Sequence, residues 1–223
     1  MVTSISCQKE KFKLKYDVSR ETMKKLEKYE AILKASQRKF NLIGKSTENK
    51  IWARHFYDSA FSTKFIVDII SRNENKKFNL IDVGSGAGFP GLVVALMCQK
   101  SPNISFTLIE SNKKKAFFLE NVVAHLELNV KVLNKRVEEE SEKFDFIVAR
   151  AVAPLNKLLK LVSKISKKDS ILLAFKGQSW KEEVRLLKKE WNYKSLIVKN
   201  NKDLENSRGV LLLIYSFSKK SRP

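Results

Sequence analysis

Four of the seven glycines in this chain lie within eight residues, between Gly84 and Gly91, directly after the apolar run Phe78–Val83. Because glycine has no Cβ atom, a glycine-rich loop lets the backbone approach a ligand closely. In an open parallel sheet, ligands bind beyond the carboxyl ends of the strands. A turn that binds nothing would need only one or two glycines. The cluster therefore predicts the first strand of a parallel sheet followed by a ligand-binding loop.

Short apolar runs alternate with helical patterns along the rest of the chain, which is typical of a doubly wound α/β fold. No helical pattern covers residues 199–207, so the last two strands should form an antiparallel hairpin. The pattern therefore predicts a seven-stranded, mostly parallel sheet with one antiparallel strand. The predicted strands are Phe78–Val83, Ser105–Ile109, Val130–Leu133, Phe144–Ala149, Ile171–Phe175, Leu196–Val198 and Val210–Phe217. The predicted helices are Gly91–Cys98, Lys113–Leu126, Pro154–Ile165 and Trp180–Trp191.

The first 70 residues have a different pattern. Apolar side chains recur every three to four residues from Arg20 to Phe40, and a second helical stretch runs from about Ile51 to Ile70. We therefore expect an N-terminal helical extension over residues 1–70 and an α/β domain over residues 71–223, packed as one compact unit.

Composition excludes some classes of protein. The longest apolar run, Val210–Phe217, is far shorter than the roughly 20 residues of a membrane span. Lysines also interrupt the start of the chain, where a secretory signal would be apolar. We expect a soluble, cytoplasmic protein without a membrane partner. Cys7 and Cys98 are far apart in the sequence, so both should be reduced, with Cys98 in the core.

The net charge is +20, from 44 basic and 24 acidic residues. Such a charge attracts phosphate backbones, which favours a nucleic-acid partner. The alternative is a lysine-rich composition whose charges are simply solvated.

The glycine loop fits two templates. Gly86-x-Gly88-x-x-Gly91 matches the dinucleotide fingerprint, whereas Asp82-x-Gly84-x-Gly86-x-Gly88 matches the loop of S-adenosylmethionine-dependent methyltransferases. Position favours the second, because the first glycine follows the strand at once and Pro90 separates the last two. Asp82 could then face the ammonium group of the cofactor, and bare amides of the loop from Gly84 through Ser85 to Gly88 could receive its carboxylate.

Glu110 ends the second strand, where a ribose diol would need an acceptor, although a surface glutamate is the plainer alternative.

Several motifs in the same order closely resemble the GidB (RsmG) family. They are Asn41–Ile43, Arg54–Ser59, Asp82–Gly91, Leu108–Ser111, Lys113–Lys114, Phe118–Leu119, Arg136–Glu139, Phe144–Leu155 and Lys176–Gln178. The resemblance covers residues 40–215 and implies a Rossmann-like class I methyltransferase fold. It also implies S-adenosylmethionine-dependent methylation of guanine N7 in small-subunit ribosomal RNA, near the decoding region. Glu110 stands where many members have Asp, and Ile43 where many have Thr.

Three further groups of residues have two interpretations each. Val137 and Glu138 follow the third strand, where such a sheet places the adenine, or else they begin a solvated helix. Arg150 ends the fourth strand, facing the methyl group and the base, or else it pairs with a helix end. Arg54 with Asp58, and His55 with Ser59, share faces of one helix; they line the cleft, or they only order the helix.

The expected RNA contacts are less specific. Lys176, after the fifth strand, and Lys157 could bind phosphate, or be ordinary solvated lysines. We expect Phe89 to pack on the cofactor rather than in the core. The aromatic groups that could stack on the target base are Phe89, Phe56 and Trp52.

Guanine N7 carries a free lone pair, so its methylation needs no general base and no metal. Arg150, Arg54 and His55 are the candidate catalytic residues, and they would act by alignment. The partner would be small-subunit ribosomal RNA or the small-subunit particle. The sequence does not assign an oligomeric state, and a monomer is favoured. The rival hypotheses are a methyltransferase acting on another RNA or on a small molecule, a non-catalytic RNA-binding ribosome-assembly factor, and an NAD-dependent oxidoreductase.

Overall fold

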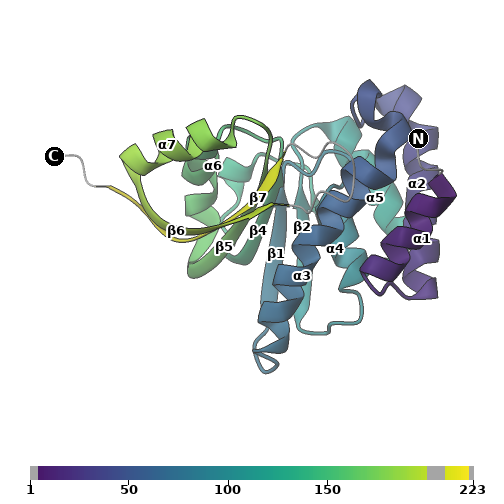
Figure 1. Cartoon of the computed structure of the whole chain (residues 1–223), viewed down its shortest axis with the longest axis horizontal. Helices are drawn as coiled ribbons and strands as arrows, with labels where there is room; N and C mark the ends of the chain where they lie inside the picture. The colour runs from purple at the N-terminus through teal and green to yellow at the C-terminus, as the bar shows by residue number, and fades with distance from the viewer. Residues whose placement is uncertain (1–4, 200–208, 221–223) are drawn as a thin grey trace.

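The computed structural model describes residues 5–199 and 209–220 as a single sheet with helices on both faces (Figure 1). The strand order is β3-β2-β1-β4-β5-β7-β6, and β7 runs antiparallel to both of its neighbours. This confirms the predicted seven-stranded sheet with one antiparallel strand. The strands are β1 Phe78–Val83, β2 Ile104–Ile109, β3 Val130–Leu133, β4 Phe144–Arg150, β5 Ser166–Lys176, β6 Trp191–Lys199 and β7 Val210–Lys219.

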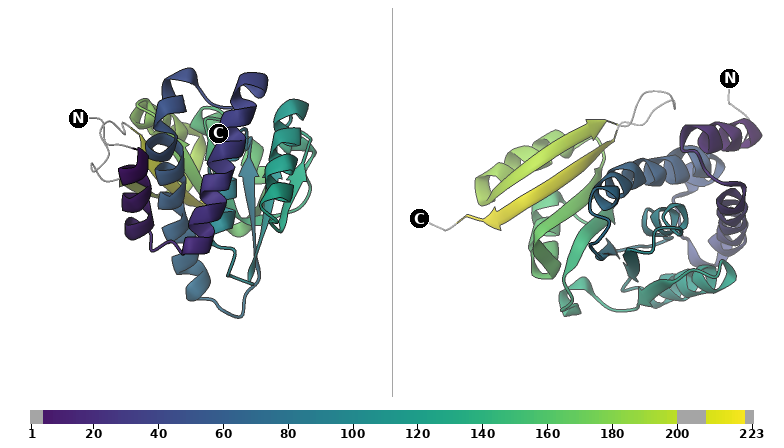
Figure 2. Two further views of the ribbon diagram at one scale, coloured as in Figure 1. Left: turned by 90° about the vertical axis from the view of Figure 1, so that its right-hand side faces the viewer. Right: turned by 90° about the horizontal axis from the view of Figure 1, so that it is seen from below.

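The helices form two groups. α6 (Leu155–Val162) and α7 (Trp180–Glu190) cover one face of the sheet and share a hydrophobic cluster with it. The other face carries α3 (Tyr57–Ser71), α4 (Gly91–Met97) and α5 (Lys113–His125). α1 (Ile5–Lys15) and α2 (Arg20–Phe40) lie outside that layer, at the end of the molecule away from β6 and β7 (Figure 2). The buried side chains of α2 share one cluster with those of α4 and α5.

Local signals set the ends of the main N-terminal helix. Ser19 caps α2 by accepting a hydrogen bond from the amide of Thr22 at 3.1 Å, and Asn41 ends it in the left-handed conformation. Met23, Leu26, Tyr29 and Leu33 form its buried stripe, as their spacing predicts. α1 has no such stripe, because Phe12 is its only buried residue among those described.

The boundaries differ from the sequence prediction in three places. The second predicted helix opens as a π-helix, Trp52–Phe56, before α3 begins, and a 3₁₀ helix, Lys45–Lys50, precedes it. β5 and β6 begin five residues earlier than predicted, at Ser166 and Trp191, because strand pairing extends them through polar stretches. The connection over residues 200–208 lies outside the described residues, but the antiparallel pairing of β6 with β7 confirms the hairpin.

The structure also bears on the cysteines and on membrane-spanning helices. Cys98 is buried, as predicted, and Cys7 is half-buried, both as free thiols. Within the described ranges, no helix is long and apolar enough to cross a membrane.

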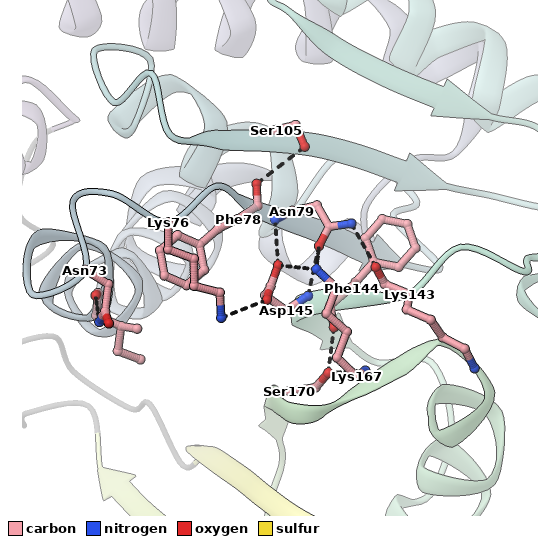
Figure 3. A network of polar contacts seen from close by, with 11 residues as sticks. Asn73, Lys76, Phe78, Asn79, Ser105, Lys143, Phe144, Asp145, Lys167 and Ser170 are labelled. Carbon is pink, nitrogen blue, oxygen red and sulfur yellow. Dashed lines mark hydrogen bonds and ion pairs between the residues drawn. The ribbon is translucent and has the colours of Figure 1, made fainter.

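A buried carboxylate joins the strands at the amino end of the sheet (Figure 3). Asp145 on β4 accepts a hydrogen bond from the amide of Asn79 at 3.0 Å, and its own amide donates to Asn79 Oδ1 at 3.0 Å. Lys167 approaches Asp145 Oδ2 at 2.7 Å, and Lys76 approaches Oδ1 at 3.2 Å. Side chains therefore continue the contact between β1 and β4 beyond the last backbone pair, Leu80 with Phe146.

We predict that Asp145→Ala lowers the free energy of unfolding by about 2 kcal/mol, because the Asn79 amide and the two lysines lose a charged acceptor. The urea midpoint measures this loss. Asp169→Ala is the matched control, since Asp169 is exposed on β5 near the same edge. Equal midpoints for the two variants would contradict the assigned role of Asp145.

The difference between wild type and Asp145→Ala should also depend on pH. Burial raises the pKa of Asp145, but hydrogen bonds from Lys167, the Asn79 amide and Lys76 outweigh burial and hold the pKa below its usual range. A carboxyl with a lowered pKa in the folded state stabilises the fold fully above its unfolded pKa of about 4. The difference should therefore persist at neutral pH and shrink as the pH falls below that value.

Candidate functional site

Three strand ends meet at the carboxyl edge of the sheet. The register pairs Val83 at the end of β1 with Ile109 of β2 on one side and with Ala149 of β4 on the other. The next residues along the three strands, Gly84, Glu110 and Arg150, therefore come together. This is the position at which parallel sheets bind ligands.

The glycine loop depends on its glycines for two different reasons. Gly86 has a φ of +59°, and a Cβ atom built there would find only the Gly84 carbonyl oxygen, at 3.8 Å. The side of the loop at Gly86 is therefore open. At Gly91, a Cβ atom would lie 2.5 Å from Leu108 and 2.6 Å from Asp82. Gly91 thus lets α4 pack directly against the strands.

The expectation of bare loop amides is wrong at four positions. The amides of Gly84 and Ser85 donate to the Ile109 carbonyl at 2.9 and 3.1 Å, and that of Gly88 donates to the Ser85 carbonyl at 2.8 Å. The amide of Gly86 donates to Glu110 Oε2 at 2.9 Å. The loop therefore satisfies these amides itself, because its tight turn brings them against β2 and its own carbonyls.

Asp82 is fully buried at the end of β1. Its Oδ2 accepts hydrogen bonds from Ser85 Oγ at 2.7 Å and from the Gly91 amide at 2.9 Å. Its Oδ1 is buried without a hydrogen-bond partner among the described residues. Burial is the main reason that the pKa of Asp82 rises to about 7, and Glu110 adds to the rise against the two hydrogen bonds. A buried carboxylate oxygen in this state needs a donor.

Glu110 is also buried, so the alternative of a surface glutamate is wrong. Its second oxygen, Oε1, accepts from the Asn112 amide at 2.8 Å. Asn134 donates to the Glu110 carbonyl at 2.9 Å. These contacts fix the carboxylate beside the open side of the loop at Gly86.

Arg150 points toward the π-helix. Its Nη2 donates to the Arg54 carbonyl at 2.5 Å and lies 3.5 Å from Asp58 Oδ2. Its Nη1 is buried with no hydrogen-bond partner in the described parts of the chain. Burial lowers the pKa of the guanidinium, while Asp58 opposes that shift. Asp82 Oδ1 is thus a buried acceptor, and Arg150 Nη1 a buried donor, that the described residues leave unsatisfied.

The helix of Arg54 and His55 lies across the glycine loop, as the resemblance implies. The His55 ring stacks on Phe89 at 4.9 Å between centroids, and its Nε2 lies 3.0 Å from Thr47 Oγ1. Burial, with the nearby charges of Arg150 and Arg54, lowers the pKa of His55 to about 3. The imidazole is therefore neutral at physiological pH. Ser59 Oγ donates to the His55 carbonyl at 2.6 Å within the helix.

The expectation that Phe89 packs on the cofactor rather than in the core is wrong. Phe89 belongs to a buried cluster, with Tyr29 stacked at 5.2 Å and Phe56 edge-on at 5.3 Å. Phe56 and Trp52 are also buried there, so neither ring is exposed to stack on a base. Phe89 turns inward from the glycine loop, and Trp52 and Phe56 turn inward from the π-helix, because the N-terminal helices supply a shared hydrophobic cluster there.

Tyr29 is a site residue that sequence reasoning missed. Its hydroxyl donates to the carbonyl of Ala87 in the glycine loop. Burial raises the pKa of Tyr29 well above its usual value, so the hydroxyl stays a donor. The sequence places Tyr29 only on the apolar stripe of a helix. The one available signal is that a buried tyrosine hydroxyl needs a partner.

The remaining expected residues lie in different surroundings. Val137 is buried against the sheet, and Glu138 is exposed beside it. Lys176 is not available for the expected phosphate contact. Its Nζ lies 2.6 Å from Glu183 and donates to the Ala153 carbonyl at 2.8 Å. Its side chain is only 9% exposed, so its charge is already compensated. Lys157 is exposed on α6. No cluster of metal ligands is found among the described residues.

The residues present fit S-adenosylmethionine. Its ammonium group matches the unsatisfied oxygen of Asp82, its carboxylate matches the unsatisfied nitrogen of Arg150, and its ribose hydroxyls match Glu110. The open side of the loop at Gly86 leaves room for it.

Solved structures share this fold at low sequence identity. A class I S-adenosylmethionine-dependent methyltransferase from Listeria monocytogenes matches with a TM-score of 0.65 and 9% identity, over 93% of this chain and 72% of that one. The CurJ carbon methyltransferase matches with a TM-score of 0.62 and 11% identity, over 97% of this chain and 72% of that one. These likenesses establish a class I methyltransferase fold.

Sequence relatives are much closer. Ribosomal RNA small subunit methyltransferase G from Mesomycoplasma hyopneumoniae strain 7448 is 37% identical over 79% of this chain and 85% of that protein. The protein of that name from Zymomonas mobilis is 38% identical over 78% of each. The GidB family, described as rRNA small subunit methyltransferase G, matches residues 22–211. This chain therefore belongs to the GidB family and is an S-adenosylmethionine-dependent methyltransferase.

Proposed function

We propose that the protein transfers a methyl group to N7 of a guanine in small-subunit ribosomal RNA. The observation that carries the proposal is the pair of buried, unsatisfied atoms, Asp82 Oδ1 and Arg150 Nη1, beside the open glycine loop of a GidB-family chain. The net charge of +20 supports a polyanionic substrate over a small molecule.

Each group in the site has a proposed role. Asp82 binds the ammonium group of the cofactor, Arg150 its carboxylate, and Glu110 its ribose. The loop of Gly84, Ser85, Gly86 and Gly88 lies against the bound cofactor, together with the backbone at Phe89. Val137 provides an apolar wall for the adenine, and Glu138 an acceptor for its amino group. Arg54, through its carbonyl, and Asp58 hold the guanidinium of Arg150 in place.

The chemistry makes few demands on the protein. S-adenosylmethionine supplies a methyl group on a sulfonium centre, which a lone pair can attack. Guanine N7 has such a lone pair and loses no proton, so the neutral His55 is not needed as a base. The catalytic contribution of Arg150 is therefore alignment, and that of Asp82 is charge.

The setting of the reaction follows from the substrate. Ribosomal RNA lies in the cytoplasm, so we place the protein there, acting as a monomer on the RNA or on the small-subunit particle. Exposed lysines such as Lys157 contribute to the attraction of phosphate, whereas Lys176 is occupied by Glu183. We treat residues 1–70 as an extension that packs with residues 71–223 in one unit, because α2 and α4 share a core.

The proposed function is tested by incubating the protein with S-adenosylmethionine carrying a labelled methyl group and with small subunits from cells that lack the protein. We expect label in N7-methylguanosine after digestion of the RNA. Naked ribosomal RNA and transfer RNA serve as parallel substrates. Label in transfer RNA alone, or in another nucleoside, would overturn the proposal.

We predict that Gly86→Ala weakens S-adenosylhomocysteine binding at least tenfold, since its methyl group would occupy the open side of the loop. The fold should lose only about 1 to 2 kcal/mol, the cost of a left-handed alanine. Calorimetry measures the affinity. Gly177→Ala is the control, because a Cβ atom at Gly177 meets no atom within 4 Å. Undiminished binding by Gly86→Ala would refute this placement of the cofactor.

We predict that Arg150→Lys lowers the rate of methyl transfer by about 100-fold, because an ammonium group cannot reach the Arg54 carbonyl, Asp58 and the cofactor together. The melting temperature should change by only a few degrees, since the positive charge remains. Single-turnover kinetics give the rate. A wild-type rate would show that Arg150 is only a structural pair for Asp58.

A further inference from the structure

An exposed aromatic ring with lysines around it lies near the site but takes no part in it. Phe117 on α5 is 60% exposed, the highest value for any aromatic side chain in the described ranges. Its neighbours Ala116, Phe118 and Leu119 are buried, so Phe117 is on the outer face of the helix. A single exposed apolar side chain is ordinary and needs no explanation. Phe117 differs from such a side chain because a second aromatic ring and several lysines lie beside it.

Phe117 contacts a second aromatic ring from another helix. The ring of Phe40, at the end of α2, lies edge-on to Phe117 with centroids 6.5 Å apart. The Nζ of the exposed Lys39 lies 5.4 Å from the centroid of Phe40. Two rings and a cation thus adjoin on the surface where α2 ends.

The first turn of α5 adds further positive charge. It consists of Lys113, Lys114 and Lys115 and contains no acidic residue. Lysines at this end of a helix carry the same sign as the positive end of its dipole, so the helix does not stabilise their charges. Lys113 and Lys114 are exposed, and neither forms an ion pair with a described residue. They precede Phe117 by four and three positions, so all three share one helix face. The arrangement is unfavourable in the free protein and favourable to a bound anion.

The topology brings this surface beside the cofactor site. Lys28 of α2 donates to the carbonyl of His125 at the end of α5, whereas the end of α2 meets the start of α5 at Phe40 and Phe117. The two helices are therefore antiparallel neighbours. α5 begins three residues after Glu110, and the capping residue Asn112 is itself bonded to that carboxylate. The rings and lysines consequently adjoin the edge at which the reaction occurs.

We propose that Lys39, Phe40, Lys113, Lys114 and Phe117, here called the Phe117 patch, dock single-stranded RNA next to the target base. The proposal rests on the proposed function. The lysines match phosphates, and an exposed aromatic face binds unpaired bases by stacking. A duplex hides its base faces, so the ring specifies a loop or a splayed strand as the occupant.

The test measures binding of two fluorescent RNAs, one single-stranded and one a blunt duplex, by anisotropy. Phe117→Ala should weaken binding of the single-stranded RNA about tenfold and binding of the duplex less than twofold, since stacking is lost only for unpaired bases. Phe117→Tyr should restore the affinity because it keeps the ring. Leu186→Ala is the matched control, as Leu186 is 43% exposed on α7. Equal affinity of Phe117→Ala and wild type for the single strand would overturn the proposal.

Charge reversal tests the lysines. Lys113→Glu with Lys114→Glu should weaken binding of both RNAs. For the single strand, it should reduce the slope of log affinity against log salt by about 1.4, at ~0.7 per phosphate contact. Lys164→Glu with Lys168→Glu changes the net charge equally at the amino end of the sheet, where both lysines are exposed, and should leave the slope nearly unchanged. Equal effects of the two double variants on RNA binding would overturn the proposal, because the net charge of the whole protein would then account for the attraction.

Two further measurements separate this inference from its foundation. Every variant should bind S-adenosylhomocysteine with wild-type affinity, because none alters the cofactor site. A wild-type protein that binds RNA but methylates none would overturn the proposed function. Variants that bind RNA normally but lose affinity for whole small subunits would overturn the patch as an RNA site and point to a ribosomal protein as its partner.

Discussion

One carboxylate oxygen holds the cofactor loop together. Asp82 Oδ2 receives hydrogen bonds from Ser85 within the loop and from Gly91 at the start of α4, so it ties both ends of the loop to β1. Because the other oxygen has no partner among the described residues, the same group that closes the loop also demands a donor from a ligand. Structural support and ligand binding are thus combined in one buried charge, and the pKa raised to about 7 reflects that burial.

The N-terminal helices complete the site from outside. Phe89 carries the loop into their aromatic cluster, where Tyr29 and His55 stack on its ring and the Tyr29 hydroxyl binds the Ala87 carbonyl. The π-helix supplies the Arg54 carbonyl that orients Arg150, and π-helical turns are frequent at functional sites. Residues before β1 therefore contact both the glycine loop and Arg150. The GidB match, which begins at residue 22, includes Tyr29, Arg54 and His55.

Positive charge alone does not locate an RNA surface in this protein. Lys176 ends β5 at the carboxyl edge of the sheet, yet Glu183 compensates its charge and the Ala153 carbonyl accepts its hydrogen bond. Lys113 and Lys114 have no ion pair with a described residue, and an exposed ring lies on their face of the helix. A lysine becomes a plausible phosphate ligand when its charge is uncompensated and its neighbours offer a second kind of contact.

The sequence by itself determined the succession of elements. The strand before the glycine cluster, the alternation of strands and helices and the final hairpin all appear as expected, since backbone conformation and periodic burial are local properties. It also placed Asp82, Glu110 and Arg150 at strand ends, because parallel strands share one carboxyl edge. Only the tertiary structure decided that Phe89 is core, that Lys176 is paired, and that Tyr29 reaches the loop. Those outcomes depend on which side chain of a distant helix meets which atom, and such long-range contacts leave no periodic trace in the sequence.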